Sequence, residues 1–260
     1  PHSTYAVSEE PLARVRTLSD ELEVQVHTHL HETRDEVVQS LRAHGERPLA
    51  RLDRLGLLGP SLIAVHMTQL EDDEIARVAE TGTHVIHCPE SNMKLASGFC
   101  PVARLLDAGV NVALGTDGAA SNNDLNMLAE MRTAALLAKG VAGSAAAVPA
   151  ETALRMATLN GAKALGIDDE TGSLELGKAA DIVALDLRNP HTQPLYHACS
   201  QMVYAASSNQ VSQVWIAGQQ VIRDHEPVTL SAPAILEAAQ GWRERIDQYR
   251  TSPRDDDQRA

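Results

Sequence analysis

Aromatic residues are scarce in this chain, which has one Phe, two Trp and four Tyr among 260 residues. The core must therefore be built mainly from Ala, Val, Leu and Ile. In other respects the composition is that of a soluble globular protein, with 43% hydrophobic and 22% charged residues. The length suits one large domain or one and a half ordinary ones.

Basic residues are also few, since 22 Lys and Arg stand against 35 Asp and Glu and leave a net charge of −13. Nucleic acids and anionic membranes bind basic faces, so neither is expected as a partner. We interpret the excess charge as a solvated acidic surface. No apolar run approaches the ~18 residues that span a membrane, and no signal peptide is evident.

The only three cysteines, Cys88, Cys100 and Cys199, are too far apart for a disulfide framework or a structural zinc motif. This usage suits a reducing compartment, so we expect a cytoplasmic protein. The chain also lacks an initiator Met and opens with Pro1-His2-Ser3. We therefore expect that position 1 is not the natural start.

Short runs rich in Val and Ile alternate with helical patterns along most of the chain. Strands are predicted over residues 24–29, 62–66, 84–87 and 110–114. Helices are predicted over residues 11–22, 33–43, 71–81, 101–108, 125–139 and 149–164. This alternation predicts parallel βαβ units, which occur in doubly wound sheets and in (β/α) barrels.

The polar residues at the strand ends favour the barrel. His29, His66 and His87 end three of the predicted strands, and Asp117 comes just after the fourth. In a barrel these ends converge on one mouth, whereas in an open sheet they spread along an edge. No GxGxxG motif follows any strand, so a dinucleotide site has no support.

His29 and Glu32 form the first candidate site. A neutral imidazole at a strand end is a good zinc ligand, and a carboxylate three residues later can reach a substrate beside the metal. Strand alternation would put His27, His29 and His31 on one face and Thr28 on the other. The alternative is a polar loop that is rich in His by chance.

Asp117 and His66 form the second candidate site. Asp117 stands between Gly115-Thr116 and Gly118, where glycines allow the backbone to approach a bound group closely. Alternatively, Asp117 forms an Asx-turn or caps the next helix. His66 would more simply be a core or rim histidine, but its strand lies between those of His29 and Asp117.

Two weaker candidates follow the third predicted strand. His87 is expected to support the site from behind. Asn92 is expected to shape its loop or to contact the substrate. Further along, residues 181–186, 211–217 and 221–222 are predicted strands of a small β-domain, and residues 232–249 an amphipathic helix. The charged tail over residues 251–260 is expected to be disordered.

Several motifs together resemble those of the amidohydrolase superfamily. They are the opening Pro1-His2-Ser3-Thr4-Tyr5, Cys88-Pro89-Glu90-Ser91-Asn92-Met93-Lys94-Leu95, Gly115-Thr116-Asp117-Gly118, and residues 157–162 and 172–182. The branch that they resemble most is that of the 5-methylthioadenosine/S-adenosylhomocysteine deaminases, with the triazine hydrolases as relatives. The likeness covers the chain to about residue 227 and says little about the substrate.

The resemblance implies an α/β fold, a (β/α)₈ barrel with a β-sandwich built from both chain ends. Residues 1–170 would be the C-terminal portion of the barrel, from the end of strand 4 through strand 8. Residues 171–230 would be part of the sandwich, and residues 231–260 a helix and flexible tail. The HxH pair of strand 1 is absent, because His27-Thr28-His29 has its spelling but the context of strand 5. We therefore expect the chain to need a missing N-terminal barrel half.

The resemblance also implies a site. One divalent metal, Zn²⁺ or alternatively Fe²⁺, would be held by His29 and Asp117. Glu32 resembles the carboxylate that contacts the purine, and His66 resembles the strand-6 histidine beside the reacting water. His2 resembles a substrate-contacting histidine. Glu32, His66 and Asp117 would be catalytic, and His2, Glu32 and Asp117 would bind the substrate.

The implied reaction is hydrolytic deamination of an adenine nucleoside, 5'-methylthioadenosine or S-adenosylhomocysteine, to the inosine analogue and ammonia. The partner would be this small purine nucleoside, and the family leads us to expect a homo-oligomer. The alternatives are a triazine-type aminohydrolase or chlorohydrolase and a metal-free barrel scaffold. The joint presence of His29, Glu32, His66 and Asp117 speaks against the scaffold.

Overall fold

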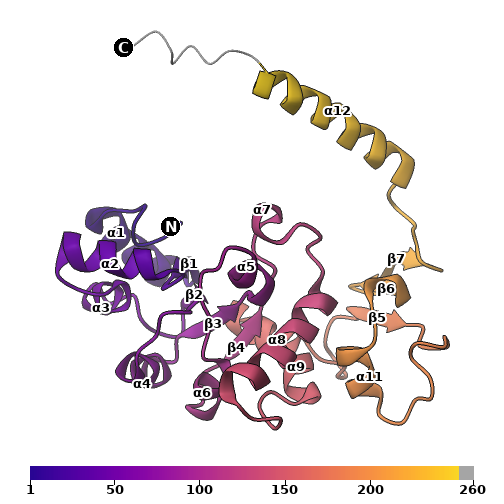
Figure 1. Cartoon of the computed structure of the whole chain (residues 1–260), viewed down its shortest axis with the longest axis horizontal. Helices are drawn as coiled ribbons and strands as arrows, with labels where there is room; N and C mark the ends of the chain where they lie inside the picture. Colours follow the sequence, from indigo (N-terminus) through magenta and orange to yellow (C-terminus); the bar gives the residue numbers. More distant parts are fainter. Residues whose placement is uncertain (252–260) are drawn as a thin grey trace.

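The computed structural model describes residues 1–251 (Figure 1). Its first part alternates strands and helices: α1 (Glu9–Leu22), β1 (Val26–Leu30), α2 (Arg34–His44), α3 (Pro48–Arg54), β2 (Leu62–His66), α4 (Asp72–Thr81), β3 (His84–His87), α5 (Pro89–Lys94), α6 (Val102–Asp107), β4 (Val112–Leu114), α7 (Ala119–Asn122), α8 (Met127–Ala142), α9 (Ala150–Met156) and α10 (Leu159–Leu165). The four strands form a parallel sheet in the order β1-β2-β3-β4. The predicted βαβ rhythm is confirmed.

The register of this sheet brings the carboxyl ends of its strands to one edge. Leu30 pairs with His66, and His87 pairs with Leu114. One face of the sheet carries Leu30, Leu62 and Ala64 and packs into the main hydrophobic core. The opposite face carries His27, His29 and Ile63, because side chains alternate along a strand.

The second part is a small antiparallel sheet, and the chain between its first two strands forms a helix that packs against α8 and α9. Its elements are β5 (Ile182–Leu185), α11 (Ala198–Tyr204), a 3₁₀ turn (Ser208–Gln210), β6 (Val211–Ile216), β7 (Gln219–Arg223) and β8 (Glu226–Pro227). The sheet has the order β5-β6-β7-β8. The three strands predicted in this region are confirmed, and β8 was not predicted.

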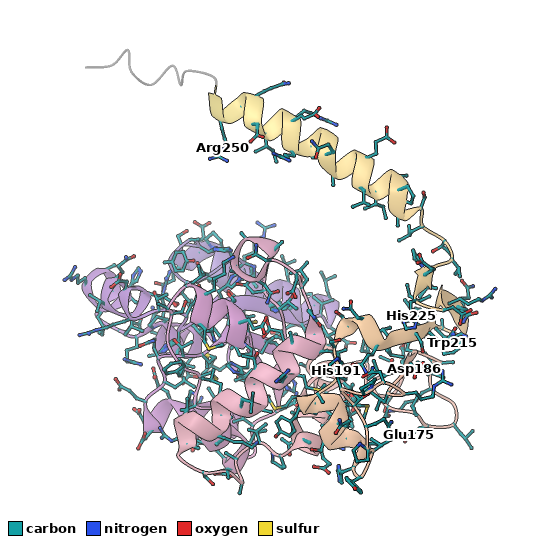
Figure 2. All side chains as sticks on the ribbon, turned by 45° about the vertical axis from the view of Figure 1, so that its right-hand side comes forward. Glu175, Asp186, His191, Trp215, His225 and Arg250 are labelled. Carbon is teal, nitrogen blue, oxygen red and sulfur yellow. The ribbon has the colours of Figure 1, made fainter. Side chains whose placement is uncertain are left out.

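The last element, α12 (Ala232–Thr251), leads away from the small sheet. In Figure 2, Arg250 marks its far end, well away from Trp215 of β6. Large apolar side chains of α12 are exposed: Ile235, Leu236, Trp242, Ile246 and Tyr249. The tail predicted to be disordered lies, beyond Thr251, outside the described residues. Among the described helices, none is both long and apolar enough to cross a membrane.

Two predictions of local structure were wrong. The single helix expected over residues 149–164 is two helices, α9 and α10, because Thr158 leaves helical backbone with φ −134° and ψ −97°. This break lets the Asn160 side chain donate to the carbonyl oxygen of Val112 at 2.8 Å. The loop expected around Asn92 is instead a short helix, α5, which begins at Pro89, where the ring fits the first helical turn.

Candidate active site

The residues of the site lie at the carboxyl edge of the parallel sheet. His29 belongs to β1, His66 ends β2, and Asp117 follows β4 by three positions. One ligand atom from each of these side chains can be chosen so that all three lie within 4.8 Å of one another. The Nε2 of His29 is 3.8 Å from Oδ1 of Asp117. The predicted convergence of these strand ends is therefore observed.

Left-handed backbone directs two of these side chains. His66 has φ 78° and Asp117 has φ 60°, values that are uncommon for residues other than glycine. Strand alternation would put His66 on the core face beside Leu30. Its turn instead stacks the imidazole on His29, with ring centroids 5.3 Å apart. Such strained backbone is typical of functional sites.

Hydrogen bonds fix which nitrogen of each imidazole faces the site. The Nδ1–H of His29 donates to the main-chain oxygen of His2 at 2.7 Å, and the Nδ1–H of His66 donates to Oδ1 of Asn92 at 2.8 Å. Both rings therefore present the lone pair of Nε2. The Nε2 of His66 is buried and has no hydrogen-bond partner among the described residues. A bound cation would supply that partner.

Hydrogen bonds from two serines hold the carboxylate of Asp117 through one of its two oxygens. Its Oδ2 accepts hydrogen bonds from the hydroxyls of Ser91 and Ser121, each at 2.7 Å, while Oδ1 faces His29. Burial opposes ionisation, but the two hydroxyls, the Gly118 N–H and His66 outweigh it and hold the pKa of Asp117 below its usual value. The site therefore has an anionic oxygen ligand at neutral pH.

The imidazole of His66 is neutral at the same pH. Burial lowers the pKa of His66, although nearby Glu32 acts in the opposite direction. Neutral imidazole nitrogens with one carboxylate oxygen are a donor set that divalent cations such as zinc prefer. His29, His66 and Asp117 thus form a candidate metal site whose chemistry fits such a cation.

Glu32 lies beside this cluster, with its carboxylate 3.9 Å from Nε2 of His66. Its loop is held from behind by the buried carboxyl of Glu36, which accepts the N–H groups of Glu32 at 2.6 Å and of His31 at 3.2 Å. Sequence reasoning missed Glu36. The available signal was Thr33, three residues earlier, since this spacing suggests a capping box.

His2 also lies at the site, but its clearest contact is through the backbone. The main-chain oxygen of His2 accepts from His29, and its exposed ring lies 4.6 Å from the His29 ring. The Nε2 of His2 is 3.2 Å from the hydroxyl of Tyr5. The sequence suggested a substrate contact for the side chain and did not indicate that the backbone orients His29.

Two other predicted histidines do not join the cluster. His31 does not share a face with His29, because β1 ends at Leu30 and His31 turns with φ 53° into the interior. There its ring lies 3.2 Å from the Gln69 oxygen and accepts the Leu49 N–H at 3.0 Å. His87 is buried on the core face of β3, and burial lowers its pKa to about 3.

Comparison with known proteins agrees with this geometry. The model of the amidohydrolase family matches residues 1–221. The chain belongs to the amidohydrolase family. Amidohydrolases with similar sequences include the 5-methylthioadenosine/S-adenosylhomocysteine deaminase of Teredinibacter turnerae, which is 52% identical over 246 residues. That match covers 95% of this chain and 56% of the relative.

Solved amidohydrolase structures are similar as well. An adenosine deaminase from Xanthomonas campestris with bound zinc superposes with a TM-score of 0.94 at 54% identity, covering 95% of this chain and 56% of the other. An atrazine chlorohydrolase from Arthrobacter aurescens, also complexed with zinc, has a TM-score of 0.85 at 27% identity, covering 89% and 51%. The chain thus spans about half the length of the relatives that it matches, and its parallel sheet corresponds to part of their barrel.

Proposed function

We propose that this chain is the C-terminal part of a zinc-dependent deaminase of adenine nucleosides, with 5'-methylthioadenosine or S-adenosylhomocysteine as substrate. The observation that carries the proposal is the gathering of His29, His66 and Asp117 ligand atoms within 4.8 Å, with Glu32 beside them. The deaminases named above, at 52% and 54% identity, support it.

His29 and Asp117 would hold the metal, and the Nε2 of His66, the second imidazole nitrogen of the cluster, would face the water beside it. When bound, a divalent cation supplies an acidified water at neutral pH. Imidazole and carboxylate ligands suit both zinc and iron. We prefer zinc because it is bound in the adenosine deaminase from Xanthomonas campestris.

The chain's own side chains would move the protons. Asp117 accepts a proton from the attacking water and later passes it to the departing amine. Glu32 protonates the ring nitrogen next to the carbon under attack, so that negative charge does not build up on the purine. His66 orients the water and stabilises the tetrahedral intermediate. The C–N bond then breaks, ammonia leaves, and the inosine analogue remains.

The substrate would also touch His2 at the rim of the site. The remaining contacts, including those to the 5'-substituent, would come from an N-terminal barrel half that carries the HxH pair. The domain limits at residues 170 and 230 and the homo-oligomeric state belong to the same proposal. A triazine hydrolase is the alternative, but the chlorohydrolase of that type is only 27% identical.

The test is an assay of the intact natural protein with 5'-methylthioadenosine, S-adenosylhomocysteine and a chlorinated triazine. We expect ammonia release from the nucleosides only. Glu32→Gln should abolish turnover, whereas Glu10→Gln, an exposed glutamate of α1, should not change it. Full turnover by the Glu32 variant would remove Glu32 from the proposal. Activity on the triazine alone would favour the alternative.

A further inference from the structure

The orientation of Asp117 depends on two short helices. Ser91 comes from α5, which has six residues, and Ser121 comes from α7, which has four. Helices this short have no stability of their own, because one or two turns do not repay the cost of nucleation. Something outside them must hold both hydroxyls 2.7 Å from the same Oδ2.

The side chain of Glu130, in α8, contacts both of these helices. One of its oxygens, Oε2, accepts the backbone N–H of Glu90 at 3.3 Å, and Glu90 directly precedes Ser91. The other, Oε1, accepts a hydrogen bond from the side chain of Asn122, which directly follows Ser121. Both carboxyl oxygens are therefore used to join α5 to α7.

Glu130 is fully buried, with 0% of its surface exposed. Burial raises its pKa to about 8, although the Glu90 N–H and the Asn122 amide favour the ionised form. A buried carboxyl is costly compared with an apolar side chain of similar size. If the residue at this position of α8 only filled space, an apolar side chain would be more stable than a carboxyl group.

We propose that Glu130 is a positioning residue for Asp117, acting through Ser91 and Ser121. By fixing α5 against α7 it keeps both serines on Oδ2 and leaves Oδ1 directed at the metal position beside His29. Removing these two acceptor contacts lets the two short helices separate, and Asp117 then rotates away from His29. This inference rests on the proposed zinc site.

The test measures zinc affinity of the intact natural protein by competition with a chelator, without substrate. Glu130→Gln keeps the shape but offers one acceptor in place of two. We expect it to weaken zinc binding by roughly 10- to 100-fold, the usual effect of losing a residue that supports a ligand. Asn122→Ala breaks the same link from the α7 side. It is measured in place of Glu130→Gln if that variant does not fold.

Two controls separate positioning from stability. Met131→Ala removes the buried apolar side chain next to Glu130 in α8, and it should lower stability while leaving zinc affinity unchanged. In a Ser91→Ala/Ser121→Ala background, Glu130→Gln should cause little further loss, because its effect passes through the serines.

Equal loss of affinity from Glu130→Gln with and without the serines would overturn the inference, as would unchanged affinity in Glu130→Gln. Wild-type protein that binds zinc but does not deaminate a nucleoside would instead sink the proposed function and leave the inference standing.

Discussion

At the scale of single residues, the site depends on partners that remove the freedom of its ligands. The tautomer of His66 is set by Asn92 and that of His29 by a main-chain oxygen of residue 2. A ring that is free to exchange tautomers would present a lone pair to the metal position only part of the time. The partners therefore matter for chemistry as well as for packing.

Asn92→Ala should accordingly lower both activity and zinc affinity of the intact protein by roughly 10- to 100-fold. The cause is the loss of the oxygen that accepts the Nδ1–H of His66. Ser97→Ala is a suitable control, because this buried serine has an Oγ without a hydrogen-bond partner among the described residues. Wild-type zinc affinity in the Asn92 variant would contradict the role given to Asn92.

His87 should make stability fall in acid. Burial lowers its folded-state pKa to about 3, while the unfolded chain binds the proton near the ordinary value of about 6.5. Its contribution is therefore fully present above pH 6.5 and is lost as pH falls from there toward 3. The loss is about 1.4 kcal/mol per pH unit.

Denaturant unfolding at pH 7.5 and pH 5.0 measures this contribution. His87→Phe should flatten the pH dependence by ~2 kcal/mol between these values, whereas His191→Gln, at an exposed histidine, should not. The same slope in wild type and in the His87 variant would show that other groups cause the acid sensitivity.

At the scale of elements, α2 sets the loop that carries Glu32. Thr33 is its N-cap, and the Thr33 hydroxyl accepts the N–H of Glu36 at 3.2 Å. The carboxyl of Glu36 in turn accepts the N–H groups of the preceding loop. One helix start thus positions a proposed catalytic carboxylate.

Thr33→Ala should destabilise the protein by ~1 kcal/mol, the usual cost of losing a side-chain N-cap. Ser8→Ala makes a matched comparison, because Ser8 precedes α1 and its side chain makes no capping hydrogen bond. This substitution should leave the free energy of unfolding nearly unchanged. Thermal unfolding of both variants distinguishes them. Equal effects would mean that the hydrogen bond of Thr33 does not stabilise α2.

At the scale of the whole molecule, the described residues leave surfaces without partners. The parallel sheet has four strands, and β1 lies at one of its edges. Among the described residues, the outer side of β1 pairs only through an isolated bridge between Ser3 and His29. Large apolar side chains of α12, such as Trp242, are exposed. Unpaired strand edges and exposed apolar faces promote association.

Residues 1–260 expressed alone should therefore self-associate, and they should bind zinc weakly if the proposed HxH pair contributes to the metal site. The intact natural protein should be well dispersed and bind about one zinc ion per chain, as expected for a site of this type. Size-exclusion chromatography with metal analysis compares the two. A stable monomer of residues 1–260 with tight, stoichiometric zinc binding would contradict the proposed need for a further barrel half.

Local patterns in the amino-acid sequence were enough to predict the strands, their order and the strand ends that carry chemistry. Hydrophobic alternation and strand-end polar residues are local signals, so β2 and β3 lie at the residues predicted, and His29, His66 and Asp117 meet as expected. The motifs shared with amidohydrolases predicted in addition that these strands are part of a barrel.

The orientation of each side chain, in contrast, depends on how distant segments pack together. Ser91 and Ser121 reach Asp117 from two helices, and Asn92 reaches His66 across 26 positions of sequence. A left-handed turn takes His31 into the interior although strand alternation predicted otherwise. Such contacts depend on where distant segments pack, and a pattern of neighbouring residues contains no information about that.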